Sequence, residues 1–104
     1  TMTYEEFYTI VTEARARQLD LLQKKGVDYS DGADRLSNFK QAGRRMGITP
    51  LQVLGVYLDK HLAAIGRYIR EGQVESEPIQ GRIDDAQNFL VLLLALIEEE
   101  AIHD

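Results

Sequence analysis

Nine consecutive apolar residues, from Phe89 to Ile97, constrain the fold of this chain most strongly. Pro78, which precedes them, is a residue type that favours the first turn of a helix. A helix that begins at Pro78 and continues through the run is apolar on every side over its second half. Such a helix lies at the centre of a bundle or is shared with another subunit. The run therefore predicts other helices packed around it.

Capping signals predict two helices before the middle of the chain. Thr3 has the spacing to a glutamate that is typical of a capping box, and the helix that follows is expected to end at Gly26. Residues 27–32 are rich in turn formers and predict a loop. A second helix is expected to start near residues 31–33 and to end at Gly47.

The strongest start signal of the chain is Thr49 followed by Pro50, which predicts a third helix that ends at Gly72. The fourth helix begins at Pro78. The chain has almost no strand pattern, and its short connections favour antiparallel neighbours. We therefore predict an all-α fold, a four-helix antiparallel bundle that forms a single domain over residues 1–104.

The predicted third and fourth helices carry more apolar surface than a chain of 104 residues can cover. The third has two apolar stripes, and the fourth is apolar all round. Burying one such side chain is worth about 1.5–3 kcal/mol, so leaving several exposed is unfavourable. We expect a homo-oligomer, most simply a two-fold homodimer.

Composition narrows the class of protein. The apolar share of 44% and the charged share of 28% are ordinary for a globular domain. A formal net charge of −5 disfavours a nucleic-acid or anionic membrane partner. The chain has no cysteine, which excludes disulfides, Cys-ligated metals and thiol nucleophiles. The apolar run is about half the roughly 20 residues that span a bilayer, so no membrane partner is expected.

An acidic stripe leads into the apolar run. Glu77, Asp84 and Asn88 return to nearly one azimuth of a helix that starts at Pro78. Carboxylates suit Mg²⁺, which commonly sits between protein carboxylates and a substrate phosphate, so Glu77 and Asp84 are candidate metal ligands. The alternative is structural. Glu77 caps the helix, and Asp84 pairs with an arginine such as Arg67 or Arg82.

Lys60 and His61 lie in the middle of the third helix, on its apolar stripes. Lys60 is a candidate phosphate contact, and His61 is a candidate for ligand binding or proton transfer. Equally, His61 could be a neutral core residue with one hydrogen bond, and Lys60 could extend to the surface.

A second group of ligand-binding candidates surrounds the first loop. Tyr29 or Phe39 could stack on a base while Asn38, one turn after Asp34, contacts its edge. An ordinary surface loop followed by a core Phe39 explains the same residues.

Residues 40–61 also resemble a helix-turn-helix, with Thr49 at the start of the second helix. That helix offers a DNA groove little beyond Gln52, and Asp59 stands beside its one lysine, Lys60. DNA binding is therefore the third of our functional hypotheses.

The order of these residues resembles small phage and prophage proteins of the nucleotide-modification-associated type. The resemblance covers roughly residues 25–100. It is carried by Tyr29, Asp34-Arg35, Asn38-Phe39, Gly47-Ile48-Thr49-Pro50, Lys60-His61, Glu77, Arg82, Asp84 and Asn88-Phe89-Leu90. It implies nucleotide-related phage biology, with Arg82 among the ligand-binding residues, and a location in the host cytoplasm.

The chain is more distantly similar to all-α MazG-like nucleoside triphosphate pyrophosphatases, which hold Mg²⁺ with two pairs of acidic residues on two helices. Asp84 followed by Asn88 looks like the second metal-binding helix of that family. Gly81 stands where the family has a glutamate, and the first helix offers only Glu6 and Glu13. The resemblance thus implies a degenerate relative that binds a nucleotide and is not expected to cleave it.

The leading hypothesis is a homodimeric protein that binds a nucleotide or nucleotide-derived ligand. Lys60 would contact phosphate, Asn38 and Tyr29 the base or sugar, and Asp84 with Asn88 a cation or a ribose. Any catalysis would be Mg²⁺-dependent hydrolysis of a phosphoanhydride. The alternative is a non-catalytic protein–protein interaction module, whose polar residues only satisfy a helical core.

Overall fold

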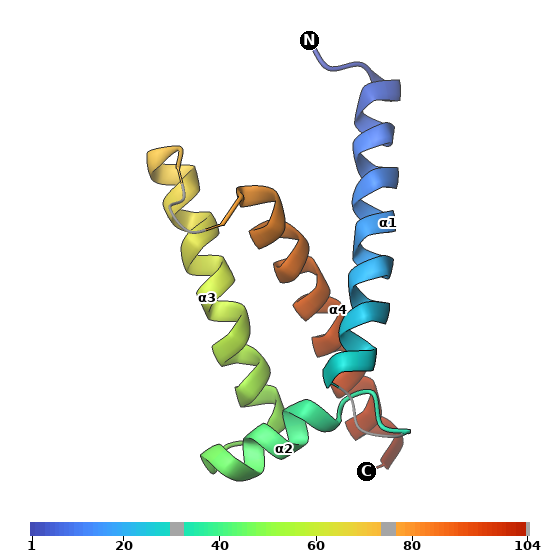
Figure 1. Cartoon of the computed structure of the whole chain (residues 1–104), viewed down its shortest axis with the longest axis vertical. Helices are drawn as coiled ribbons and strands as arrows, with labels where there is room; N and C mark the ends of the chain where they lie inside the picture. Colours follow the sequence, from blue (N-terminus) through green and yellow to red (C-terminus); the bar gives the residue numbers. More distant parts are fainter. Residues whose placement is uncertain (30–32, 74–76, 104) are drawn as a thin grey trace.

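The computed structural model describes residues 1–29, 33–73 and 77–103, and these form four helices without a strand (Figure 1). The helices are α1 (Tyr4–Tyr29), α2 (Ser37–Met46), α3 (Pro50–Glu71) and α4 (Ile79–His103). The all-α prediction is confirmed. Within the described residues, none of the helices combines the length and the apolar character needed to cross a bilayer.

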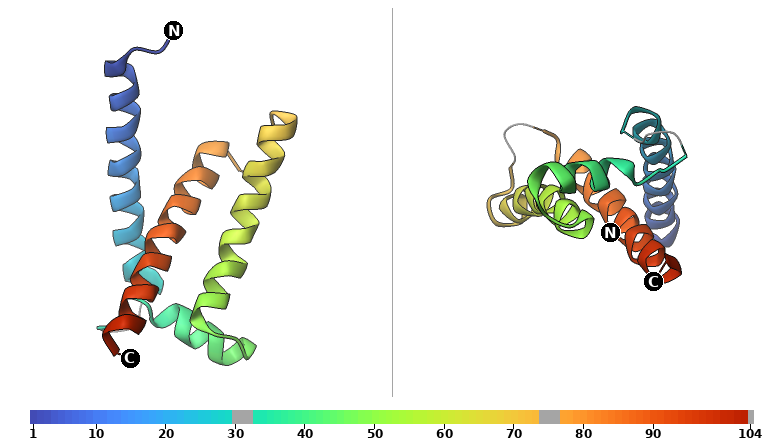
Figure 2. Two further views of the ribbon diagram at one scale, coloured as in Figure 1. Left: turned by 180° about the vertical axis from the view of Figure 1, so that it is seen from behind. Right: turned by 90° about the horizontal axis from the view of Figure 1, so that it is seen from below.

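The helix α4 lies between α1 and α3, and α2 crosses the end of the molecule where α1 ends and α3 begins (Figures 1 and 2). The predicted antiparallel packing holds for α3 and α4, whereas α1 and α4 run in the same direction. The cause is the length of α2. Its 10 residues reach about 15 Å at 1.5 Å per residue, too short to run back along helices of 22 to 26 residues.

The first helix begins as predicted, with the backbone N–H of Glu6 donating to Thr3 Oγ1 at 3.1 Å. Its predicted end at Gly26 is wrong, because the helix continues to Tyr29. A Cβ atom at Gly26 would lie 2.7 Å from Arg35 Nε. The glycine therefore allows the close approach of an arginine and does not end the helix. The predicted loop is thus helical up to Tyr29, and its remaining positions, 30–32, lie outside the described residues.

The second helix starts at Ser37, later than the predicted start near 31–33. Asp34 accounts for the difference, because its Oδ1 accepts a hydrogen bond from Leu36 N at 3.0 Å and holds a turn before the helix. The end of this helix is confirmed at Gly47, whose φ of 71° is the left-handed conformation of a helix cap.

The third helix has the predicted boundaries. Thr49 forms a complete capping box, Pro50 occupies the first turn, and Gly72 ends the helix with a φ of 76°. The fourth helix begins at Ile79, one residue after Pro78. These signals depend on neighbours in sequence, so they hold whatever the tertiary packing is.

The apolar core joins α2, α3 and α4. Phe39, Val53 and Leu54 are its largest fully buried side chains, and Leu96 of α4 packs with them. No described residue of α1 belongs to this cluster. The core therefore holds three helices, and α1 needs other contacts.

Polar contacts attach α1 to α4. Arg17 binds Asp84 with Nε–Oδ2 at 2.8 Å, and the Gln18 side-chain amide donates to the Gln87 carbonyl oxygen at 3.4 Å. These pairs are offset by 67 and 69 positions, so Ile79, the first residue of α4, lies level with positions 10–12 of α1. The turns of α1 before those positions extend beyond the start of α4 (Figure 1).

Candidate functional site

A cavity of about 350 Å³ lies between α1, α2 and α4, and Tyr57 adds a side chain of α3 to its wall. Small-molecule sites in proteins have volumes of roughly 300–1,000 Å³ and combine an apolar lining with a few placed polar groups. This cavity has that character. Its lining brings together aromatic rings, amides and basic side chains from four helices and from the segment before α2.

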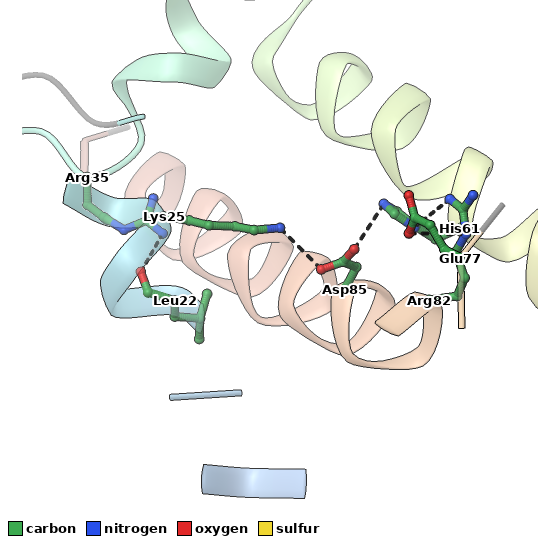
Figure 3. Close-up of polar contacts among 7 residues, drawn as sticks. All are labelled: Leu22, Lys25, Arg35, His61, Glu77, Arg82 and Asp85. Atoms are coloured by element: carbon green, nitrogen blue, oxygen red, sulfur yellow. Dashed lines mark hydrogen bonds and ion pairs between the residues drawn. The ribbon is translucent and has the colours of Figure 1, made fainter. Parts of the chain in front are cut away.

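The charged groups of the lining are mostly basic. Among the described residues of the lining, Lys25, Arg35 and Arg45 are basic and Asp85 is acidic. Lys25 Nζ is 3.2 Å from Asp85 Oδ1, and Arg35 Nη2 donates to the Leu22 carbonyl oxygen at 3.1 Å (Figure 3). Although the chain carries a net charge of −5, the described charged residues of the lining are three basic ones and one acidic one, a balance that suits an anionic ligand.

Aromatic rings form a row along one side of the cavity. Tyr57 lies between Phe39 and Phe89, with ring centroids 6.3 and 6.2 Å apart. His61 stacks on Phe89 with a centroid distance of 5.5 Å and an interplanar angle of 29°. Tyr57 is 36% exposed, so part of its ring is accessible. The row offers flat surfaces on which a planar ligand can stack.

Two asparagines of the lining have polar atoms without partners. Asn88 is 4% exposed, and neither its Oδ1 nor its Nδ2 has a hydrogen-bond partner among the described residues. Asn38 Oδ1, on α2, is also buried and unpartnered. Leaving a buried donor or acceptor unsatisfied costs about 1–3 kcal/mol, so such atoms are normally bonded by a ligand or by ordered water. Because both residues line the cavity, a ligand can supply the missing bonds.

A chain of polar contacts runs from the cavity wall to the start of α4 (Figure 3). Asp85 Oδ2 is 3.9 Å from His61 Nε2, His61 Nδ1 is 3.4 Å from Arg82 Nη1, and Arg82 Nε is 3.5 Å from Glu77 Oε2. An arginine can only donate, so His61 accepts at Nδ1 and carries its proton on Nε2, toward Asp85. Burial lowers the pKa of His61, although the Asp85 charge opposes this. The imidazole is therefore neutral at pH 7.

The carboxylates predicted as metal ligands each have an arginine partner. Asp84, 5% exposed, is held by two bonds from Arg17, at 2.8 and 3.3 Å, and this contact raises the pKa of Arg17. Asp84 thus has an arginine partner, as the structural alternative required, but the partner is neither Arg67 nor Arg82. Glu77 is exposed and pairs with Arg82. In the described part of the chain, no three His, Asp or Glu residues gather as metal ligands would. The magnesium site stays a prediction.

Other predicted ligand-binding residues lie outside the cavity lining. Lys60 is exposed on α3. Asp34 Oδ2 accepts from Lys40 Nζ at 2.7 Å, and this bond, with one from Leu36 N, lowers the pKa of Asp34. Lys40 Nζ is also 2.8 Å from Glu99 Oε1, so Asp34 and Lys40 connect α2 with the end of α4.

The structure therefore brings together only part of the predicted set. Asn38 and Asn88 line the cavity, and His61 contacts its wall through Asp85 and Phe89. The side chain of Tyr29 lies outside the described residues, so its predicted contact with a base stays untested.

Four charged residues of the cavity were not among the predicted site residues: Lys25, Arg35, Arg45 and Asp85. Asp85 had a usable signal, because with Asn88 it begins an i, i+3, i+4, i+7 pattern on α4. The predicted stripe contained Asp84 instead of Asp85. The two residues are adjacent in sequence, but their side chains point in different directions from the helix. The three basic residues come from separate segments, and no spacing in the sequence relates them.

Comparison of the chain with family models, curated proteins and solved structures finds no match. The functional assignment therefore rests on the chemistry of the cavity.

Proposed function

We propose that the protein binds a nucleotide or nucleotide-derived small molecule in the cavity between α1, α2 and α4. The observation that carries this proposal is the unpartnered amide of Asn88, buried in the wall of a cavity whose charge is mostly basic. A ligand with hydrogen-bonding edges and an anionic group satisfies both features at once.

The three kinds of lining residue match two parts of a nucleotide, the phosphate and the base. Arg35 and Arg45 are suited to the phosphate, because a guanidinium matches its geometry with paired donors. Tyr57 and Phe89 offer rings against which a base can stack. The amides bind the edge of the base. Lys25 already faces Asp85, so a phosphate that reaches Lys25 competes with that carboxylate.

Isothermal titration calorimetry against nucleoside mono- and triphosphates, with and without Mg²⁺, tests the proposal. Arg45 and Arg44 are exposed neighbours on α2, but only Arg45 is part of the cavity lining. A charged hydrogen bond is worth about 1.5–3 kcal/mol, so Arg45→Gln should weaken binding about tenfold or more. Arg44→Gln is the matched control and should bind like the wild type. Absence of heat from every nucleotide, or equal losses in the two variants, would refute the proposal.

We also propose that the protein is a homodimer that pairs through α4. Ile83, Leu90, Leu94 and Ile97 are 41%, 53%, 57% and 48% exposed, and they recur at the seven-, four- and three-residue spacing of a coiled-coil seam. On a helical wheel this seam lies opposite Asp85, on the side of α4 away from the cavity. An apolar seam along one helix can pack against the same seam of a second subunit related by a two-fold axis.

Sedimentation velocity tests the dimer, whose mass would be twice the 11.8 kDa of the chain. Leu94→Glu places a charge in the seam and should give a monomer. Leu62→Glu changes a leucine of α3 that is 50% exposed and outside the seam, and it should leave the dimer intact. A monomeric wild type, or dissociation by Leu62→Glu alone, would contradict pairing through α4.

A further inference from the structure

The unpartnered atoms of the cavity wall define which edge of a base fits them. Asn88 presents an acceptor, Oδ1, and a donor, Nδ2, and neither is bonded to any residue that the structure describes. Asn38 adds a second unused acceptor from α2. Both residues line the same cavity. The wall thus offers two acceptors and one donor to which a bound ligand can form hydrogen bonds.

Nucleobases differ in how well they complement this set. Cytosine and adenine carry an exocyclic amino group, with two N–H donors, beside a ring nitrogen that accepts. Uracil and hypoxanthine present a carbonyl oxygen and a single ring N–H at the same edge. With one of these oxo bases, an asparagine oxygen of the wall would face a carbonyl oxygen or no donor at all.

We infer that the cavity selects bases with an exocyclic amino group next to an unprotonated ring nitrogen, cytosine or adenine, over their oxo counterparts. The inference rests on the proposed nucleotide-binding function and specifies its ligand class. Discrimination arises because an asparagine oxygen that loses water and gains no donor opposes binding of the oxo base. The phosphate contacts of Arg35 and Arg45 are common to all nucleotides and add nothing to the preference.

Two matched pairs of nucleotides isolate the base edge: CMP with UMP, and AMP with IMP. The members of each pair share the ribose, the phosphate and nearly the same volume. In calorimetric titrations, the amino member of at least one pair should bind about tenfold or more tightly than its oxo partner, the size of discrimination that paired amide contacts give. Equal affinities within both pairs would overturn the inference while the proposed function stands. No binding of any of the four, together with no heat from the other nucleoside mono- and triphosphates, would overturn the proposed function itself.

Variants assign the preference to the asparagines. Asn88→Leu removes a donor and an acceptor, and it should lower the ratio of the two Kd values within a pair, leaving only the share that comes from Asn38. Asn38→Leu should lower the ratio in part, which keeps the test open if the first variant folds poorly. Arg45→Gln is the control, because it should weaken both members of a pair equally. A preference that is undiminished in both asparagine variants would refute the assignment.

Discussion

Replacing Asn88 by leucine in the ligand-free protein should make the fold more stable. Asn88 is 4% exposed, and neither polar atom of its amide has a hydrogen-bond partner among the described residues. Leucine has a similar size and branching and no polar atoms. Exchange of an unsatisfied amide for an apolar group of the same shape is neutral or stabilising. Binding residues commonly reduce stability in this way, because their bonds await a ligand.

The magnitude follows from the two orphaned atoms of Asn88. Each unsatisfied buried group costs about 1–3 kcal/mol. Imperfect packing of the new leucine beside the cavity offsets part of the stability gained by removing these groups. We expect Asn88→Leu to raise the free energy of unfolding by about 1–2 kcal/mol. For a domain of this size, 1 kcal/mol shifts Tm by roughly 4–8 °C.

Gln18→Met is a matched control for this measurement. Gln18 is also a buried amide, 8% exposed, but both of its ends are used. It accepts from Arg15 Nη1 at 3.2 Å and donates to the Gln87 carbonyl oxygen at 3.4 Å. Loss of two hydrogen bonds should lower the free energy of unfolding by about 1–2 kcal/mol.

Urea denaturation of the two variants and the wild type is compared at one protein concentration, so that self-association of the kind proposed above does not add a concentration effect. The expected shifts have opposite signs. If Asn88→Leu is instead destabilised as strongly as Gln18→Met, the amide of Asn88 has a structural role, and the reasoning from unpartnered atoms to a ligand is wrong.

Two further predictions concern stability. Burial lowers the pKa of His61 below its ordinary 6.5, so at a pH between the folded and unfolded pKa values the unfolded chain binds a proton that the folded chain does not. The free energy of unfolding of the wild type should therefore fall as the pH drops below about 6.5. His61→Gln should remove that part of the fall in a series of thermal melts. A Cβ at Gly43 would lie 2.6 Å from the Ile48 carbonyl oxygen, so Gly43→Ala should lower the free energy of unfolding by about 1–3 kcal/mol. Gly55→Ala, with open space around it in the interior of α3, should raise it by about 0.5–1 kcal/mol, and equal effects of the two alanines would contradict this reading of the turn between α2 and α3.

The sequence predicted helix boundaries wherever a local signal decides them. Thr49, Gly47 and Gly72 act through bonds to residues within a few positions, and all three boundaries are confirmed. The glycine at position 26 did not end the helix, because it makes room for the side chain of Arg35, and this tertiary contact has no local sequence signal. The direction of α1 relative to α4 was missed as well, because it follows from the length of α2 rather than from a pattern within either helix.

The candidate site was predictable only where one helix carries the information. Asn88 was identified because a polar residue precedes an apolar run, and the structure places it in the cavity wall. The arginine partner of Asp84 is 67 positions away, and no spacing rule connects Arg17 with it. The basic character of the cavity is likewise a product of tertiary structure, since Lys25 and Arg45 lie on different helices.

The absence of described α1 residues from the apolar core has a consequence for how a ligand arrives. Salt bridges and amide contacts contribute to the attachment of this helix, and ionic strength weakens the exposed ones while leaving an apolar core intact. Its amides should therefore exchange with deuterium sooner than those of α3, as one cooperative unit. Leu22 and Lys25 lie on α1, so the cavity loses one of its walls whenever α1 separates from α4. A bound molecule that contacts both Lys25 and Asn88 would connect α1 to α4 and would slow this local opening.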